Sequence, residues 1–169
     1  LPYYSPFNNS NAVSAELAAK LAERSPGDLN QVCFTTGGST AVDAALRFVQ
    51  FRNNVLGKPE KKVFISRHYA YHGSTYLSAS VSGKERDGSL MDVDQSVRLL
   101  PDVCPSRRPA GQSEEAFLAE KLDDLEQAIL EIGPERTAAF IAEPLLASGG
   151  VIAPPAGYHA GTKAICEKY

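Results

Sequence analysis

The sequence has no apolar run that approaches the roughly 20 residues of a membrane-spanning helix. It also shows no charged N-terminal region followed by an apolar stretch and a cleavage site. A basic run is absent too, and the net charge of −3 is spread over interspersed acids and bases. We therefore expect a cytoplasmic protein that binds neither membrane nor nucleic acid.

Cysteine is scarce. The three residues, Cys33, Cys104 and Cys166, are odd in number and far apart. That spacing suits neither a disulfide framework nor a zinc site, so we expect a reducing compartment and no metal. Cys33 lies in an apolar segment and is expected to be a small core residue.

What is present is enough for one domain of ordinary size, because 43% of the 169 residues are hydrophobic. The first residue is Leu1, not Met, and the chain stops at Tyr169 within a helical pattern that has no capping Gly or Asn. We expect the sequence to be a piece of a longer protein.

Strand and helix patterns alternate along the chain. Apolar spacing and capping residues predict helices at 11–24, 39–55, 74–80 and 114–132, and short strands at 31–35, 63–66, 97–100 and 138–142. The continuous apolar character of 138–142 suggests burial on both faces. This alternation predicts an α/β fold with a mainly parallel sheet and helices on both faces.

Three of these strands run into loops rich in functional side chains: TTGGST, RHYAYHG and EPLLASGG. In parallel α/β sheets, ligands collect beyond the carboxyl ends of the strands. We therefore expect the three loops to converge on one site.

The first loop belongs to the stretch FTTGGSTAVDAAL, which runs from Phe34 to Leu46. The free N–H groups and the dipole at a helix N-terminus attract a phosphate, and the Ser39 hydroxyl can donate to it or cap the helix. Phosphate binding and plain capping are both compatible with the segment. It matches neither a Walker loop nor a GxGxxG motif.

The other two loops also allow two interpretations each. Tyr71 can stack on a planar ligand or be a partly buried aromatic residue, and His72 can be an acid or base or a structural histidine. Glu143, before Pro144, can pair with a ligand or accept bonds from neighbouring N–H groups.

In order along the chain, three segments resemble the class III pyridoxal-phosphate-dependent aminotransferases, the ω-transaminase group of fold type I. They are SPFNNSNAVSAELAAKLAERSPGDLNQVCFTTGGSTAVDAALRF, KKVFISRHYAYHGSTYLSAS and AAFIAEPLLASGGVIAPPAGYHAGTKAICEKY. The resemblance implies an incomplete large domain of that fold. Residues 1–30 would lead into it, and 31–169 would form the first half of its cofactor-binding part.

The resemblance also implies pyridoxal 5'-phosphate as cofactor. Ser39 and its backbone would hold the phosphate, Tyr71 would stack on the pyridine ring, and Glu143 would lie near the cofactor and the substrate. The full set of cofactor-binding residues implied is Gly38, Ser39, Tyr71, His72, Gly73 and Glu143. Phe7 would reach towards an active site across a homodimer interface.

Two departures accompany the resemblance. The family usually has Glu where this chain has Thr40. The Asp that pairs with the pyridine nitrogen and the Schiff-base Lys would both lie beyond Tyr169, so we expect this segment to be inactive alone.

The full-length parent would transfer an amino group from an amine or ω-amino acid to a 2-oxo acid such as pyruvate. Alternatives are a non-catalytic module that binds a phosphate-bearing ligand, or an aminomutase or decarboxylase with the same cofactor.

Overall fold

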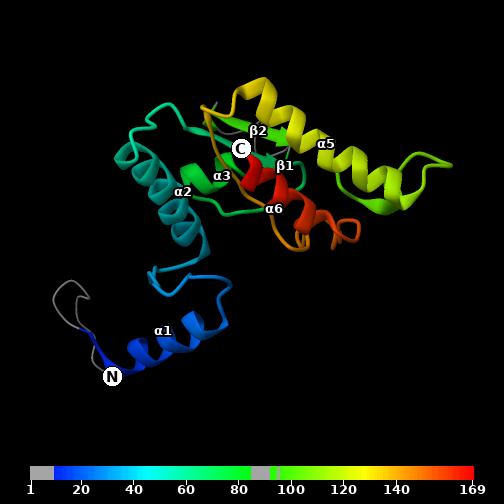
Figure 1. The fold of residues 1–169 in the computed structure, drawn as a ribbon. Helices are drawn as coiled ribbons and strands as arrows, with labels where there is room; N and C mark the ends of the chain where they lie inside the picture. The colour runs from blue at the N-terminus through cyan, green and yellow to red at the C-terminus, as the bar shows by residue number, and fades with distance from the viewer. Residues whose placement is uncertain (1–9, 85–91, 95) are drawn as a thin grey trace. The chain divides into compact units, whose positions relative to one another are not determined.

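The computed structural model describes residues 10–84, 92–94 and 96–169, and the chain divides into two units, Leu1–Thr35 and Thr36–Tyr169 (Figure 1). In the first unit, α1 spans Ala12–Arg24. Its N-cap is Asn11, whose side-chain oxygen accepts the Ser14 N–H at 2.9 Å, and this confirms the predicted start of the helix. Phe7 lies outside the described residues.

The predicted strand at 31–35 is wrong, because the structure assigns no strand to these residues. Cys33 is exposed, so the expectation that it is a core residue is wrong as well. An apolar run becomes a strand only where a neighbouring strand takes up its backbone bonds. The sheet of this structure consists of three other segments.

The sheet lies in the second unit. It contains β1 (Val63–Arg67), β2 (Val97–Leu100) and β3 (Thr137–Phe140) in the order β2-β1-β3, and both neighbouring pairs are parallel. The parallel α/β architecture is therefore confirmed. The third strand is shifted by one residue and shorter than the predicted 138–142.

Helices cover both faces of this sheet, as predicted (Figure 1). Successive side chains of a strand point to opposite faces. Phe64 of β1 accordingly packs with Leu46 on one face, and Ile65 packs with Leu125 and Ile129 on the other. The helical elements of this unit are α2 (Gly38–Val55), α3 (Tyr76–Ser80), η1 (Pro105–Arg107), α5 (Glu114–Ile132) and α6 (Tyr158–Lys168).

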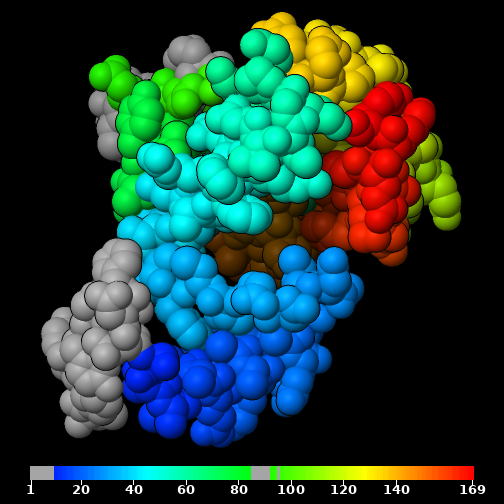
Figure 2. Space-filling model, turned by 60° about the vertical axis from the view of Figure 1, so that its left-hand side comes forward, coloured from blue at the N-terminus to red at the C-terminus, as the bar shows by residue number. Residues whose placement is uncertain are grey.

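The expected burial of the third strand on both faces is wrong, because β3 is only half-buried. Among the described residues β3 pairs with β1 alone and so lies at the edge of the sheet. Figure 2 shows the orange segment around residue 140 recessed between α2 and α6. An edge strand keeps one side open, which an apolar sequence pattern does not reveal.

Candidate cofactor site

The N-terminus of α2 presents unpaired backbone donors. The first intrahelical bond runs from the Ala41 N–H to the Gly37 carbonyl at 3.0 Å. The N–H groups of the three residues before Ala41 therefore have no carbonyl four residues earlier within the helix to bond to. A Cβ added at Gly38 would meet nothing within 4 Å, so the space beside this backbone is open. Such an end favours an anion.

Thr40 ties this helix start together. Its hydroxyl accepts the Gly37 N–H at 3.1 Å and donates to the Gly37 carbonyl at 2.8 Å. Gly37 has no side chain, so Thr40 alone supplies the side-chain part of the capping. Ser39 is thus not needed for a capping bond and stays available for another partner.

Ser39 joins α2 to the loop after β1. Its hydroxyl oxygen accepts the Ser74 N–H at 3.0 Å, and its carbonyl accepts the Thr75 hydroxyl at 3.4 Å. Gly73 makes this contact possible, because it has a φ of +140° and its added Cβ would lie 2.7 Å from the Ser39 hydroxyl oxygen. L residues rarely adopt such a φ, so this position requires glycine on two grounds.

Glu143 joins the same loop to the segment after β3. One carboxylate oxygen accepts the Tyr71 N–H at 2.9 Å, and the other accepts the Ala147 N–H at 3.2 Å. The carboxylate thus serves the neighbouring N–H groups, one of the two roles that the sequence allowed. Tyr71 as a residue is 44% exposed, and the Lys84 ammonium lies 4.9 Å from the centre of its ring.

His72 points inward between these two contacts. The backbone N–H of His72 donates to the Ser82 hydroxyl at 2.9 Å. The ring nitrogen Nε2 is buried without a partner among the described residues. Burial lowers the pKa of this imidazole below its usual 6.5; Glu143 opposes the shift and Arg67 adds to it. The ring is therefore held in its neutral form.

The structure thus brings together the six residues predicted for the site, since the bonds of Ser39 and Glu143 tie Gly38, Tyr71, His72 and Gly73 into one cluster. Sequence reasoning missed Ser82 and Arg67, which hold this cluster from within. The sequence offered one indication of the role of Arg67, because a charged residue at the end of an apolar strand is unusual.

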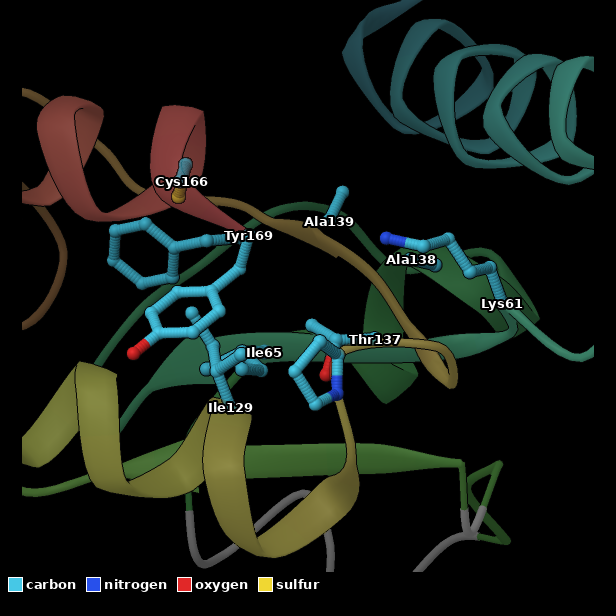
Figure 3. A pocket seen from close by; sticks show the side chains of 10 residues that line it. Lys61, Ile65, Ile129, Thr137, Ala138, Ala139, Cys166 and Tyr169 are labelled. Atoms are coloured by element: carbon cyan, nitrogen blue, oxygen red, sulfur yellow. The ribbon is translucent and has the colours of Figure 1, made fainter. Parts of the chain in front are cut away.

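A cavity of about 290 Å³ lies elsewhere, along the open side of β3 (Figure 3). Figure 3 shows Cys166 of α6, Tyr169 just after this helix and Ile129 of α5 around it. None of the six predicted residues lines this cavity. It is a consequence of the open sheet edge and not the candidate site.

Two absences hold for the part of the chain that the structure describes. None of its helices is long and apolar enough to cross a membrane. Within the same residues, no group of three or more His, Cys, Asp or Glu side chains could hold a metal ion.

The chain is similar to several known transaminases. It is 41% identical to gamma-aminobutyrate transaminase 1, mitochondrial, of Oryza sativa subsp. indica, over all of this chain and 34% of the relative. It is 40% identical to the vanillin aminotransferase of Capsicum chinense, over all of this chain and 38% of the relative. The chain therefore spans between a third and two fifths of these relatives.

Solved structures agree with this similarity. The omega transaminase from Pseudomonas jessenii in complex with PMP matches the whole chain with a TM-score of 0.95 and 43% identity, over 38% of that structure. The sequence profile of the aminotransferase class-III family matches residues 5–169. The chain belongs to the class-III aminotransferase family.

Proposed function

We propose that the intact protein carrying this chain is a pyridoxal 5'-phosphate-dependent aminotransferase. Its reaction moves an amino group from an amine or ω-amino acid to a 2-oxo acid such as pyruvate. The observation that carries this proposal is the bond between Ser39 and Ser74, which joins the open start of α2 to the loop of Tyr71. Family membership and the names of the similar proteins support it.

The residues present fit this cofactor. A phosphate would take the free N–H donors at Gly38 and Ser39, where an added Cβ at Gly38 meets open space. The Ser39 hydroxyl oxygen accepts from Ser74, so its own proton is available for a phosphate oxygen. Tyr71 is exposed, and its ring would offer a stacking surface for a planar ligand on the side away from the Lys84 ammonium. The solved complex with PMP supports the same assignment.

The bound cofactor supplies the electron sink for the substrate carbon from which a proton is removed. The residues of this chain bind and orient it. Ser39 and the start of α2 would hold the phosphate end, and Tyr71 would stack on the ring. Together they would hold the reactive end of the cofactor in one position. Such fixed orientation contributes to the rate.

Glu143 acts by positioning and not by proton transfer in this proposal. Both of its carboxylate oxygens accept backbone N–H groups, one from each loop. Moving a proton onto either oxygen would remove the negative charge and so weaken the contacts that hold Tyr71 and Ala147. His72 supports the loop as a neutral ring, since burial lowers its pKa.

We further propose that the intact protein is a homodimer that acts on small amines and 2-oxo acids. Covalent attachment of the cofactor requires a lysine in a particular sequence context. None of the lysines of this chain lies in that context. The segment alone is therefore expected to be inactive. A cytoplasmic location stays a prediction, because the relatives include proteins named mitochondrial and chloroplastic.

One experiment tests the function. The intact protein is incubated with pyruvate and a panel of amines and ω-amino acids, and alanine formation is measured alongside carbon dioxide release. Alanine formed only with added cofactor supports transamination, and the isolated segment serves as the inactive control. Carbon dioxide without alanine indicates a decarboxylase. Cofactor binding without any turnover of the intact protein indicates a binding module, and either result overturns the proposal.

A further inference from the structure

Arg67 is a buried cation behind the candidate site. It is the last residue of the central strand β1 and has an exposed fraction of 0%. Its Nη2 donates to the Glu143 carbonyl at 2.6 Å, and its guanidinium carbon lies 5.6 Å from the centre of the Tyr158 ring. It therefore contacts the segment after β3 and the first residue of α6 from inside the fold.

This arrangement is a poor source of stability. Nε and Nη1 of Arg67 have no hydrogen-bond partner among the described residues, and neither has the Tyr158 hydroxyl. Burial lowers the pKa of Arg67 and raises that of Tyr158. Each unmade bond of a buried group costs free energy of folding, and taking a cation out of water carries a further desolvation cost.

Among the described residues, the one hydrogen bond of the Arg67 guanidinium is made to Glu143. Its acceptor is the carbonyl of the residue whose carboxylate accepts the Tyr71 and Ala147 N–H groups. Pro144 follows directly and stiffens the backbone there. Fixing the carbonyl of Glu143 therefore also fixes where its carboxylate points.

We propose that Arg67 is a positioning residue, which holds the Glu143 backbone from inside the fold so that the Glu143 carboxylate keeps the Tyr71 and Ala147 loops in place. Only the last step, in which Tyr71 carries the cofactor ring, rests on the proposed function. The bonding of the two loops by Glu143 is independent of it.

The test compares the Arg67→Met variant of the intact protein with the wild-type intact protein, both free of cofactor. Met fills a similar volume and removes the charge and the bond to Glu143. We expect the thermal unfolding midpoint to stay within a few degrees of wild type or to rise. Hydrogen exchange at the Tyr71 and Ala147 amides should become at least about tenfold faster. Arg98→Met is the matched control, because Arg98 lies on the neighbouring strand, pairs with Glu131 at 3.0 Å and is exposed.

A second readout measures cofactor affinity. Arg67→Met should weaken equilibrium binding of pyridoxal 5'-phosphate about tenfold, which corresponds to about 1.4 kcal/mol. Arg67→Lys keeps the charge and can donate from one nitrogen atom, without the planar fork of the guanidinium, so its amide exchange and affinity should lie between those of wild type and Arg67→Met. Arg98→Met should leave both unchanged.

Several results would overturn the proposal. They are unchanged exchange at both amides in Arg67→Met, a large drop in its unfolding midpoint with faster exchange throughout the fold, or failure of both Arg67 variants to fold. If only Arg67→Met fails to fold, the intermediate exchange of Arg67→Lys decides. Should the wild-type protein bind no cofactor while the exchange result holds, the proposed function fails and the positioning role stands.

Discussion

Replacing Gly73 by Ala is expected to disrupt the junction between α2 and the loop of Tyr71. The new Cβ would clash with the Ser78 hydroxyl oxygen and would also lie 2.7 Å from the hydroxyl oxygen and 2.8 Å from the Cα of Ser39, and the φ of +140° is unfavourable for Ala. Backbone strain of this kind costs about 1–3 kcal/mol. Overpacking adds about 1–3 kcal/mol. We therefore expect Gly73→Ala to lower the free energy of unfolding by about 2–6 kcal/mol.

Gly111→Ala is the matched control for this measurement. Gly111 also has a positive φ, of +84°, but nothing lies within 4 Å of its added Cβ. It should therefore show the backbone strain alone, about 1–3 kcal/mol. Urea unfolding of the cofactor-free intact protein measures both variants, and Gly73→Ala should in addition bind pyridoxal 5'-phosphate more weakly because Ser39 is displaced. Equal losses in the two variants would refute the reasoning from the Ser39 contact.

Three further outcomes are expected. Gly38→Ala should change the unfolding free energy by no more than about 0.5 kcal/mol, because its Cβ meets nothing within 4 Å; it should nevertheless weaken cofactor binding in equilibrium dialysis, and unchanged affinity would argue against a ligand there. Ser39→Ala and Tyr71→Ala should each lose bound cofactor faster on dialysis, and retention like wild type in both would reject the site assignment. Burial lowers the pKa of His72 below the 6.5 of the unfolded chain, so the unfolded state binds more protons as the pH falls. Wild type should therefore lose stability relative to His72→Gln between pH 7 and pH 5 in urea unfolding, and parallel pH dependences would contradict this.

The long helices were predictable because their signals are local. Ser113 caps α5 through the Ala116 N–H at 3.1 Å, and Gly133 ends this helix with a φ of +97°. Both roles depend on residues within one turn of the helix end. The strands were less predictable, since the segment with Cys33 has the same apolar pattern as β1 but is not a strand. Strand formation depends on a neighbour that lies far away in the sequence.

The site was predictable as a set of loops but not as a network of bonds. Parallel topology places the ends of β1 and β3 at the same edge, which is why the loops of Tyr71 and Glu143 were expected to meet. No sequence rule indicates that the Glu143 carboxylate accepts backbone N–H groups from both loops. Nor does one indicate that Arg67 bonds to a carbonyl 76 residues away. Such contacts depend on side-chain geometry in the folded chain.

Thr40 shows how the start of α2 stays fixed without the Glu that the resemblance predicts at this position. At this third position of a helix, a Glu typically reaches back to the N–H of the capping residue. Thr40 makes the same bond to Gly37 at 3.1 Å with a shorter side chain, so the start of α2 remains fixed. What Thr40 lacks is the negative charge, which stabilises a helix N-terminus by about 0.3–1 kcal/mol but repels a bound phosphate. With Thr at this position, residue 40 carries no charge that would oppose an anion at the positive end of the helix dipole.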